Sequence, residues 1–474
     1  MPAYCEDADL ALKVRDAGYR VIYQPLSVVV HYEGVTSGTD ETQGVKSYQV
    51  VNMQKMFTRW EARLKTHQRN GQDLDLAKDR MATRRVLILD HCTPTPNEDA
   101  GSVLAFNTFL LFREMGFQVT FIPEDNFLYM PGYTETLQRV GIEVLYRPYV
   151  KSVEEHLMEA KDRYDLVYLL RPMVVERNLE LVRKLCPRAK VLYHTVDLHF
   201  LRMEREAKLL NDSAKANAAV EMKEIEFAAI RNADASIVVS TNELELLRPQ
   251  LPNEKIHLFP LIMDITGTEA SFNARRDIVF VGGYQHTPNV DAVQYFVAEV
   301  MPHLRKRLPG VRFYAVGSKP PAEIKALESE DVVITGFVED LPPLLDKMRV
   351  SVAPLRYGAG IKGKIGTAMA HGLPVVATSL AAEGMSLSAN ENILVADDAQ
   401  SFAEAIVRLY EDESLWNELS LAGQDFALQE WGVEAAWVSL SKILDDIGFS
   451  TVRSQLPLSS YSFAKKDLAY DKSA

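Results

Sequence analysis

Residues 277–293 read DIVFVGGYQHTPNVDAV and carry the clearest sign of the fold. The apolar run IVFV predicts a buried β-strand, and Gly282 and Gly283 follow it directly. Asn289 is a favourable N-cap residue, so we expect a helix to begin near it. Glycines let a ligand approach the backbone, and a helix N-terminus attracts phosphate. The segment therefore predicts a strand, a turn and a helix that form an anion site; an ordinary strand-to-helix turn is the alternative.

The same alternation of short apolar runs and helix-like stretches recurs on both sides of this segment. Continuous apolar strands between helices are typical of a parallel sheet covered on both faces. The pattern occurs in two series, which predicts two doubly wound α/β domains, residues 84–265 and 266–447, that face a common cleft. The expected strands lie at 86–89, 119–122, 142–146, 166–170, 191–193 and 237–239 in the first series, and at 278–281, 311–316, 332–335, 350–353, 375–377 and 393–395 in the second.

Composition excludes several classes of protein. The chain has 474 residues, of which 47% are hydrophobic, so it can bury large cores and is not expected to be disordered. Its formal charge of −13 argues against nucleic acid as a partner, because binding to nucleic acid requires a cationic face. Three cysteines without metal-ligand spacing predict neither a disulfide scaffold nor a metal site. No apolar run reaches the ~20 residues that span a bilayer, and no signal peptide is recognisable, so a cytoplasmic protein is expected.

A second motif, APLRYGAGIKGKIGTAMAHGLPVVAT at residues 353–378, contains a glycine-rich loop after a predicted strand. Lys362 and Lys364 follow the loop at the expected start of a helix, and Gly372 is its expected C-cap. Lysines beside the free amides of a helix N-terminus favour a diphosphate. The alternative is a solvated lysine pair. The first motif, at residues 277–293, is not GxGxxG, so it does not indicate a nicotinamide cofactor.

Together with FYAVGS at 313–318, ITGFV at 334–338 and AEGM at 382–385, these motifs resemble the donor domain of the family 4 (group 1) glycosyltransferases. That family has a GT-B fold, in which two Rossmann-like domains face a cleft, and the resemblance covers most of both predicted domains. It implies that Lys362 and Lys364 hold the diphosphate of a nucleotide-sugar donor.

The resemblance implies further donor-binding residues at the ends of the second-domain strands. They are Gly282, Gly283 and His286 at the first turn, Gly317, Gly336 and Phe337 beside the base, and Glu383, Gly384 and Met385 at the sugar end. The family usually has two glutamates eight residues apart in the lysine motif. Here the second position is Thr367, which we also assign to the donor site, and the usual carboxylate contact to the ribose is absent there.

Two segments of the first domain are candidates for the acceptor side. TPTPNEDAGS at 93–102 resembles the acceptor loop of the family, with Asp99, Gly101 and Ser102 near sugar hydroxyls; helix capping by Asp99 is the alternative. YHTVDLHFLR at 193–202 concentrates polar groups at a strand end. We assign His194, Asp197 and Glu383 to catalysis and His199 and Arg202 to the acceptor, with ordinary surface residues as the alternative. The spacing is not HExxH, so zinc is not expected.

The first 80 residues resemble a different family. CEDADLALKVRDAGYRVIYQP from Cys5, followed by HYEG from His31, resembles the last third of a family 2, GT-A fold glycosyltransferase. The resemblance implies that Glu6 and Asp7 supply a general base and that His31 completes a metal site. The nucleotide-binding half of that family should lie upstream. We therefore interpret residues 1–80 as a C-terminal remnant, or as the downstream end of a longer two-transferase polypeptide, and expect no catalysis by it alone.

The resemblance implies a retaining transferase that moves a hexosyl group from a UDP-, GDP- or dTDP-sugar, as co-substrate, to a glycan or lipid-linked acceptor without a metal or other cofactor. Synthesis of a bacterial surface polysaccharide, such as lipopolysaccharide or capsule, is the expected role, and peripheral association with the inner face of the membrane is compatible with it. Two alternatives remain: a sugar-nucleotide epimerase that uses Asp99, Asp197 and Glu383 as acid and base, and a non-catalytic nucleotide- or glycan-binding protein. Residues 448–474 are expected to be a polar tail.

Overall fold

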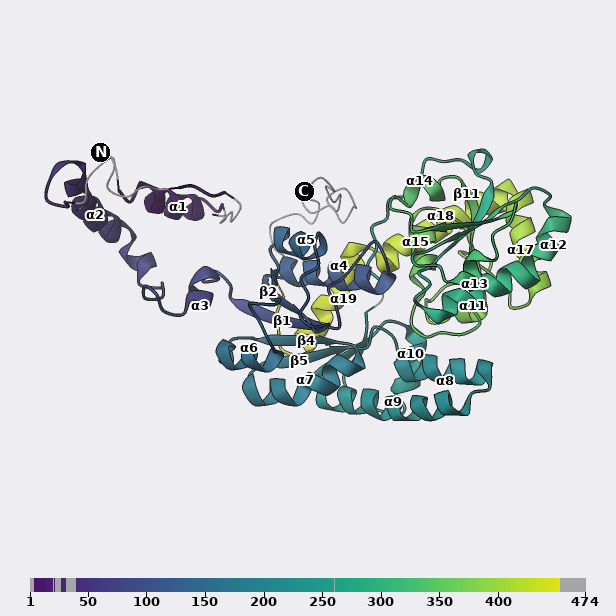
Figure 1. Cartoon of the computed structure of the whole chain (residues 1–474), viewed down its shortest axis with the longest axis horizontal. Helices are drawn as coiled ribbons and strands as arrows, with labels where there is room; N and C mark the ends of the chain where they lie inside the picture. The colour runs from purple at the N-terminus through teal and green to yellow at the C-terminus, as the bar shows by residue number, and fades with distance from the viewer. Residues whose placement is uncertain (1–3, 20, 22–26, 31–39, 260, 452–474) are drawn as a thin grey trace. The chain divides into compact units, whose positions relative to one another are not determined.

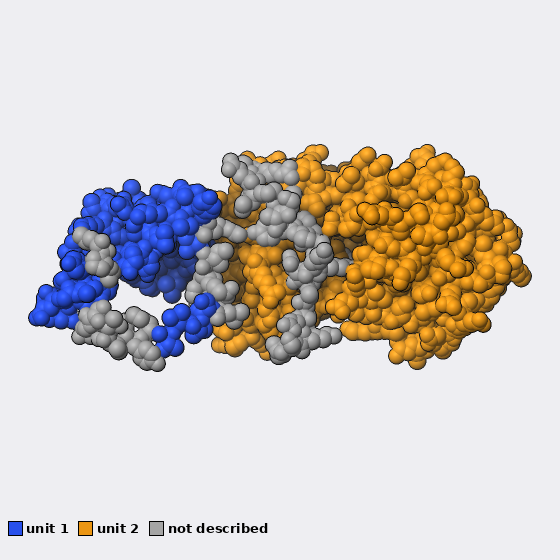
Figure 2. All heavy atoms as spheres, turned by 90° about the horizontal axis from the view of Figure 1, so that it is seen from above, with its two compact units in different colours: residues 1–81 blue, residues 82–474 orange. Residues whose placement is uncertain are grey.

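The computed structural model describes residues 4–19, 21, 27–30, 40–259 and 261–451. The chain forms two compact units, residues 1–81 and 82–474, which Figure 2 distinguishes by colour. Within the described residues, no helix is long and apolar enough to cross a membrane.

The described part of the first unit is helical. It contains α1 (Glu6–Asp16), the short 3-10 helix η1 (Gly44–Lys46), α2 (Ser47–Leu64) and α3 (Leu74–Lys78). Asp9 joins α1 to α2, because its carboxylate accepts a hydrogen bond of 2.8 Å from the Trp60 indole and pairs with Arg59 at 3.1 Å. Glu6 and Asp7 lie in the first turn of α1. His31 lies outside the described residues, so the relation to a GT-A domain stays a prediction.

The second unit contains two separate parallel sheets, as the alternation of strands and helices predicts (Figure 1). The first has the order β3-β2-β1-β4-β5-β6-β7 and the second the order β10-β9-β8-β11-β12-β13. The strands of the first sheet are β1 (Arg84–Asp90), β2 (Phe117–Pro123), β3 (Glu143–Val144), β4 (Leu166–Leu170), β5 (Lys190–His194), β6 (Ala235–Val238) and β7 (Ile256–Leu258). Those of the second are β8 (Asp277–Val281), β9 (Phe313–Val316), β10 (Val332–Gly336), β11 (Met348–Ala353), β12 (Val375–Ala377) and β13 (Leu394–Val395). Every expected strand is present, and β7 is the additional one.

Helices cover both sheets. Those of the first half of the unit are α4 (Ala100–Glu114), α5 (Tyr133–Arg139), α6 (Val153–Ala160), α7 (Pro172–Leu185), α8 (His199–Leu210), α9 (Ser213–Asn232) and α10 (Thr241–Leu247). Those of the second half are α11 (Thr287–Tyr295), α12 (Met301–Arg307), α13 (Ala322–Lys325), α14 (Pro342–Leu345), α15 (Gly363–Ala370), α16 (Ser379–Ala382), α17 (Ala399–Glu411), α18 (Glu413–Trp431) and α19 (Val433–Asp446). Two short turns complete the second half: the 3-10 helix η2 (Phe272–Ala274) and the π-helical turn η3 (Phe296–Val300) between α11 and α12.

Helix α11 begins earlier than expected. His286, not Asn289, precedes its first residue, and the Asn289 side chain instead donates a 2.7 Å hydrogen bond to the Gly283 carbonyl. The Asn289 side chain, which belongs to the first turn of α11, thus stabilises the turn formed by the two glycines. The expected strand–turn–helix unit is present, but its helix N-terminus lies closer to the two glycines.

The last helix differs from the expected domain boundary. We expected the second domain to extend to residue 447, but Leu440, Ile443 and Leu444 of α19 belong to the hydrophobic core beneath the first sheet. The chain returns to the first domain at Gly432, beside the segment that leaves it: the Met263 amide donates to the Trp431 carbonyl at 2.8 Å. Two chain segments that run side by side therefore connect the two sheet domains.

Candidate functional site: a glycine loop and two lysines between the sheets

A glycine-rich loop connects β11 to α15 and ends at the two predicted lysines. Gly358 and Gly360 have φ angles of 142° and 64°, a region that other residues rarely adopt, so the loop depends on glycine there. Lys362 is buried at the N-cap position of α15, and its ammonium group donates to the carbonyls of Ala359 at 2.9 Å and Gly360 at 2.6 Å. Lys364 donates to the Asn289 side chain at 3.0 Å. Lys364 therefore connects the first turn of α15 to that of α11, whereas Lys362 binds its own loop.

Burial weakens the positive charge of both lysines. It lowers the pKa of Lys362 to about 8, although the nearby carboxylates of Glu243, Asp197 and Glu383 oppose this change. Burial and the charge of Lys362 lower the pKa of Lys364 to about 7. A desolvated cation gains much from an anionic partner, because the partner restores the interactions that water would provide. The pair is therefore suited to a bound polyanion.

The turn after β8 brings backbone atoms very close together. A Cβ atom on Gly317 would lie 2.0 Å from the Gly282 carbonyl oxygen, so that position requires glycine. A Cβ atom on Gly283 would lie 3.5 Å from the Glu98 carbonyl, which belongs to the first domain. His286 is exposed next to this turn; crowding by protein atoms, with Lys364 and Arg202 nearby, lowers its pKa to about 4.

The predicted base pocket has a more open geometry. Gly336 has a φ angle of 68°, and the Gly317 amide donates to its carbonyl at 3.0 Å. Phe337 is 46% exposed, so its ring is available for contact. Thr367 is partly buried and lies one turn after Lys364 on α15, and residues with that spacing share a helix face.

At the predicted sugar end, the three residues have different surroundings. Glu383 pairs with Arg205 of the first domain at 2.7 and 3.0 Å. Gly384 has a φ angle of 72°, and its carbonyl accepts a 3.1 Å hydrogen bond from the Thr241 amide. Met385 is 3% exposed in the core of the second domain. Packing therefore covers the thioether, and the assignment of Met385 to the sugar end stays a prediction.

Three of the predicted first-domain residues form one polar cluster. Asp197 lies 3.2 Å from His199 Nε2, and its other oxygen lies 3.0 Å from Arg202 Nε, at ion-pair distance but without hydrogen-bond alignment. Burial alone would raise the pKa of Asp197, but His199, Arg202 and the neighbouring His286 hold it well below its usual range. A Cβ atom on Gly360 would lie 3.0 Å from Asp197 Cβ. The cluster therefore packs directly against the glycine loop.

His194 lies elsewhere. It ends β5 with no exposed surface, its ring packs near Tyr168 and Phe259, and its Nδ1 bonds the Tyr168 hydroxyl. Burial and the charge of Arg171 lower its pKa to about 3, so the ring is neutral. The residue is at the predicted strand end, but its side chain is buried and its Nε2 has no hydrogen-bond partner within the described residues, so a contact with substrate stays a prediction.

The acceptor loop follows the alternative interpretation. Asp99 caps α4, accepting hydrogen bonds from the Ser102 amide at 2.8 Å and from the Ser102 hydroxyl at 2.6 Å. Ser102 is 6% exposed. A Cβ atom on Gly101 would meet Asp99, Arg171 and Val196 at 3.2 to 3.8 Å. These contacts explain the motif as a helix start, so sugar recognition by Asp99 and Ser102 has no independent support in the geometry.

Sequence reasoning missed three residues that join the two domains or line the strand ends. Arg205 on α8 donates to the Gly358 carbonyl at 2.8 Å in addition to pairing with Glu383. Glu243 on α10 accepts a 3.1 Å hydrogen bond from the Gly360 amide. Arg171, with a φ angle of 74°, pairs with buried Asp90 at 2.8 Å. The pattern STNE at 240–243 is a capping box and could have drawn attention to Glu243; nothing in the sequence distinguishes the two arginines.

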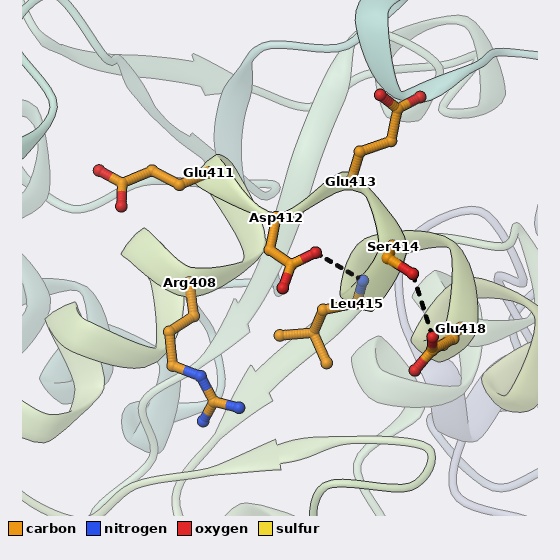
Figure 3. A pocket seen from close by; sticks show the side chains of 7 residues that line it. All are labelled: Arg408, Glu411, Asp412, Glu413, Ser414, Leu415 and Glu418. Atoms are coloured by element: carbon orange, nitrogen blue, oxygen red, sulfur yellow. Dashed lines mark hydrogen bonds between the residues drawn. The ribbon is translucent and has the colours of Figure 1, made fainter.

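A metal site and a surface hollow are two further candidates within the described residues. Across the described ranges, no group of three or more His, Cys, Asp or Glu side chains is arranged to hold a metal ion. A surface hollow lies where α17 meets α18 (Figure 3). It is lined by Arg408, Glu411, Asp412, Glu413, Ser414, Leu415 and Glu418. Four carboxylates against one arginine disfavour an anion, and none of these residues is a predicted site residue.

Comparison with known proteins agrees with the geometry of the second domain. Residues 275–412, which include the glycine turn and both lysines, match the family model of the group 1 glycosyl transferases. The second domain thus resembles a group 1 glycosyl transferase domain. A curated relative from Klebsiella pneumoniae, described as an uncharacterized 44.6 kDa protein in the cps region, is 22% identical over 175 residues. That match covers 35% of this chain and 45% of the relative, so it spans less than half of the relative's length.

Solved structures extend the likeness to both domains. Sucrose-phosphate synthase from Thermosynechococcus elongatus has a TM-score of 0.59 at 17% identity, covering 77% of this chain and 99% of its own. Anabaena HepE in complex with UDP and glucose has a TM-score of 0.58 at 16% identity, covering 76% and 99%. A variant of S. aureus TarM, in complex with fondaparinux, alpha-GlcNAc-glycerol and UDP, has a TM-score of 0.59 at 11% identity, covering 77% and 100%. These likenesses confirm the expected GT-B fold.

Proposed function

We propose that the protein is a glycosyltransferase that transfers a sugar from a nucleoside diphosphate donor to a glycan or lipid-linked acceptor. The observation that carries the proposal is the pair Lys362 and Lys364, which lie in and beside the first turn of α15 with pKa values lowered to about 8 and about 7. The group 1 match includes both lysines, and UDP is bound in the HepE and TarM structures. The comparisons support the class of reaction, and the lysines supply a physical reason for it.

In this proposal the second domain holds the leaving group. Charge develops on the diphosphate as the bond to the sugar breaks, and Lys362, Lys364 and the α15 amides stabilise that charge. The glycines at 358 and 360 let the loop backbone approach the phosphates. These groups supply positive charge without a metal ion, and the nucleotide sugar is the co-substrate. Transfer proceeds with retention of the anomeric configuration.

The first domain provides the acceptor side. Asp197, held ionised by His199 and Arg202, packs against the glycine loop from the first domain. We assign to it the orientation of an acceptor hydroxyl, with His199 and Arg202 as neighbours that contact the acceptor. Glu383, paired with Arg205, lies at the sugar end. Contacts between the domains exclude water and so limit hydrolysis of the donor.

The biological acceptor is a growing bacterial surface glycan. The cps-region relative supports this assignment, although the match covers less than half of that protein. A lipid-linked glycan would bring the enzyme to the inner face of the membrane as a peripheral protein, with the rest of the protein in the cytoplasm.

The proposal is tested in two steps. Isothermal titration calorimetry with UDP, GDP, dTDP and ADP should detect one diphosphate that binds more tightly than its monophosphate. Product analysis with the matching sugar nucleotide should then give transfer only when a glycan acceptor is present. Turnover of the donor alone to a second nucleotide sugar would instead identify an epimerase. Diphosphate binding without turnover across an acceptor panel would identify a non-catalytic binding protein, and no binding of any of the four nucleotides would refute the proposal.

A further inference from the structure

Glu243 is a carboxylate buried between the two domains. It is 1% exposed and belongs to the first turn of α10, where its amide donates to the Ser240 hydroxyl at 3.2 Å. One of its oxygens accepts a 3.3 Å hydrogen bond from the Val239 amide. These contacts are those of a helix start, and they account for one oxygen of the side chain.

The other oxygen of Glu243 connects the domains. It accepts hydrogen bonds from the Leu198 amide at 3.0 Å and from the Gly360 amide at 3.1 Å. The Gly360 carbonyl in turn accepts the 2.6 Å hydrogen bond from Lys362 Nζ. A continuous path therefore runs from Glu243 through the backbone amide and carbonyl of Gly360 to the lysine that we assign to the donor diphosphate. Capping of α10 gives no reason for this second set of contacts.

We propose that Glu243 is a positioning residue for donor binding: from the first domain it holds the glycine loop of the second domain so that Lys362 faces the diphosphate. The inference rests on the proposed function of Lys362. The donor site is then incomplete without the first domain, because a carboxylate of that domain fixes the conformation of the loop that precedes α15.

Burial raises the pKa of Glu243, and in its ionised form Glu243 stabilises the protonated form of Lys362. The charged groups around Lys362 are Glu243 on α10, Asp197 after β5, Arg205 on α8, Glu383 after α16 and Lys364 on α15. Of these, Glu243 is the strongest influence that keeps the lysine protonated, against burial. Loss of its charge should lower the pKa of Lys362 below about 8. The affinity for a diphosphate should then begin to fall at a lower pH.

Glu226 provides a matched control. It is another fully buried glutamate of the first domain, and its two oxygens accept hydrogen bonds of 2.9 Å from the amides of His199 and Phe200. All of these contacts remain within the first domain. Glu226→Gln therefore removes a buried carboxyl group, whose pKa burial raises to about 8, without touching the glycine loop.

The test uses the full chain with Glu243→Gln, Glu243→Asp and Glu226→Gln. Calorimetry with UDP, GDP, dTDP and ADP is run at pH values between 7 and 9.5, where a terminal phosphate with a pKa near ~6 stays ionised. We expect Glu243→Gln to weaken the best diphosphate about tenfold, the order of one charge-assisted hydrogen bond, and to shift the fall in affinity to lower pH. Glu243→Asp keeps the charge but shortens the side chain, so it should weaken binding while leaving the pH at which affinity falls unchanged. Glu226→Gln should stay within about twofold of the unmodified chain, as expected for a change that removes no donor contact.

The outcomes separate the inference from the proposed function. Unchanged affinity and pH profile in Glu243→Gln, or an equal loss in Glu226→Gln, would overturn the positioning role while leaving Lys362 as the diphosphate ligand. If Glu243→Gln does not fold, Glu243→Asp decides, and unmodified affinity in that variant overturns the role. If the unmodified chain binds none of the four nucleotides, the proposed function fails and the inference fails with it.

Discussion

Replacement of Lys364 by methionine should weaken diphosphate binding strongly at pH 6.5 and only slightly at pH 8.5. Methionine keeps an unbranched chain of similar length over the Phe280 ring, which lies 5.2 Å from the ammonium group, so packing is largely preserved. What is lost is the charge. Because burial and Lys362 lower the pKa of Lys364 to about 7, that charge is present at the lower pH and mostly absent at the higher one.

The magnitude follows from two opposing quantities. A charge-assisted contact to phosphate contributes about 1.5–3 kcal/mol, or roughly 10- to 150-fold in affinity. At pH 8.5 the lysine must first regain its proton, which costs about 2 kcal/mol for a pH some 1.5 units above its pKa. This cost removes most of the contribution. The affinity ratio between the unmodified chain and Lys364→Met should therefore fall from roughly 10–150 at pH 6.5 to a few at pH 8.5.

Calorimetry at the two pH values measures this ratio directly, with the matching nucleoside as a ligand that lacks phosphates. Lys306→Met is the control, because Lys306 is an exposed lysine on α12 of the same domain. The nucleoside should bind equally to all three proteins. A loss for Lys364→Met that is the same at both pH values would refute the titration argument, and no loss at either pH would remove Lys364 from the donor site.

Three further predictions concern other parts of the chain. Thr367→Glu should strengthen diphosphate binding about tenfold in calorimetry, because a carboxylate on the helix face of Lys364 would accept hydrogen bonds from the ribose hydroxyls. Unchanged or weaker binding would place Thr367 away from the ribose. Glu226→Gln should flatten the pH dependence of the free energy of unfolding, measured in urea. Burial raises the pKa of Glu226 to about 8 in the folded state, whereas the unfolded state loses this proton above about pH 4.5. The unmodified protein should therefore lose a few kcal/mol between those pH values relative to the variant, and parallel curves would contradict the shift. A chain that begins at Ala82 should retain diphosphate affinity, since that boundary separates the two compact units; a large loss in a well-folded protein would assign residues 1–81 a part in binding.

The strands of both sheets could be predicted because buried parallel strands are uninterrupted apolar runs. The strand missed, Ile256–Leu258, is three residues long with a histidine at its centre, and two of its residues are only partly buried. Such a segment is indistinguishable from a loop without its neighbour β6. The loop that carries the two lysines could also be predicted, because its glycines and lysines lie close together in the sequence.

The catalytic assignment was less predictable, because a strand end can direct a side chain to either face. His194 ends β5 and points into the core, whereas Asp197, three residues later, lies at the surface of the glycine loop. From sequence position alone, we expected both residues to take part in catalysis. Residues that act across the cleft, such as Arg205 and Glu243, are separated from their partners by more than a hundred positions. Their roles depend on how two domains meet, which no local pattern records.

The return of α19 to the first sheet has a consequence for how the chain matures on the ribosome. The last strand of that sheet ends at Leu258, but the helix that completes its core ends at Asp446, and roughly 190 residues separate them. At ~5–20 residues per second, the first sheet waits about 10–40 s for its final helix while the whole second domain is made. Of the two sheet domains, the one synthesised first is therefore completed last. A nonsense mutation between β7 and α19 should release a first domain with an uncovered apolar face, so premature termination there should yield aggregates and no half-active fragment.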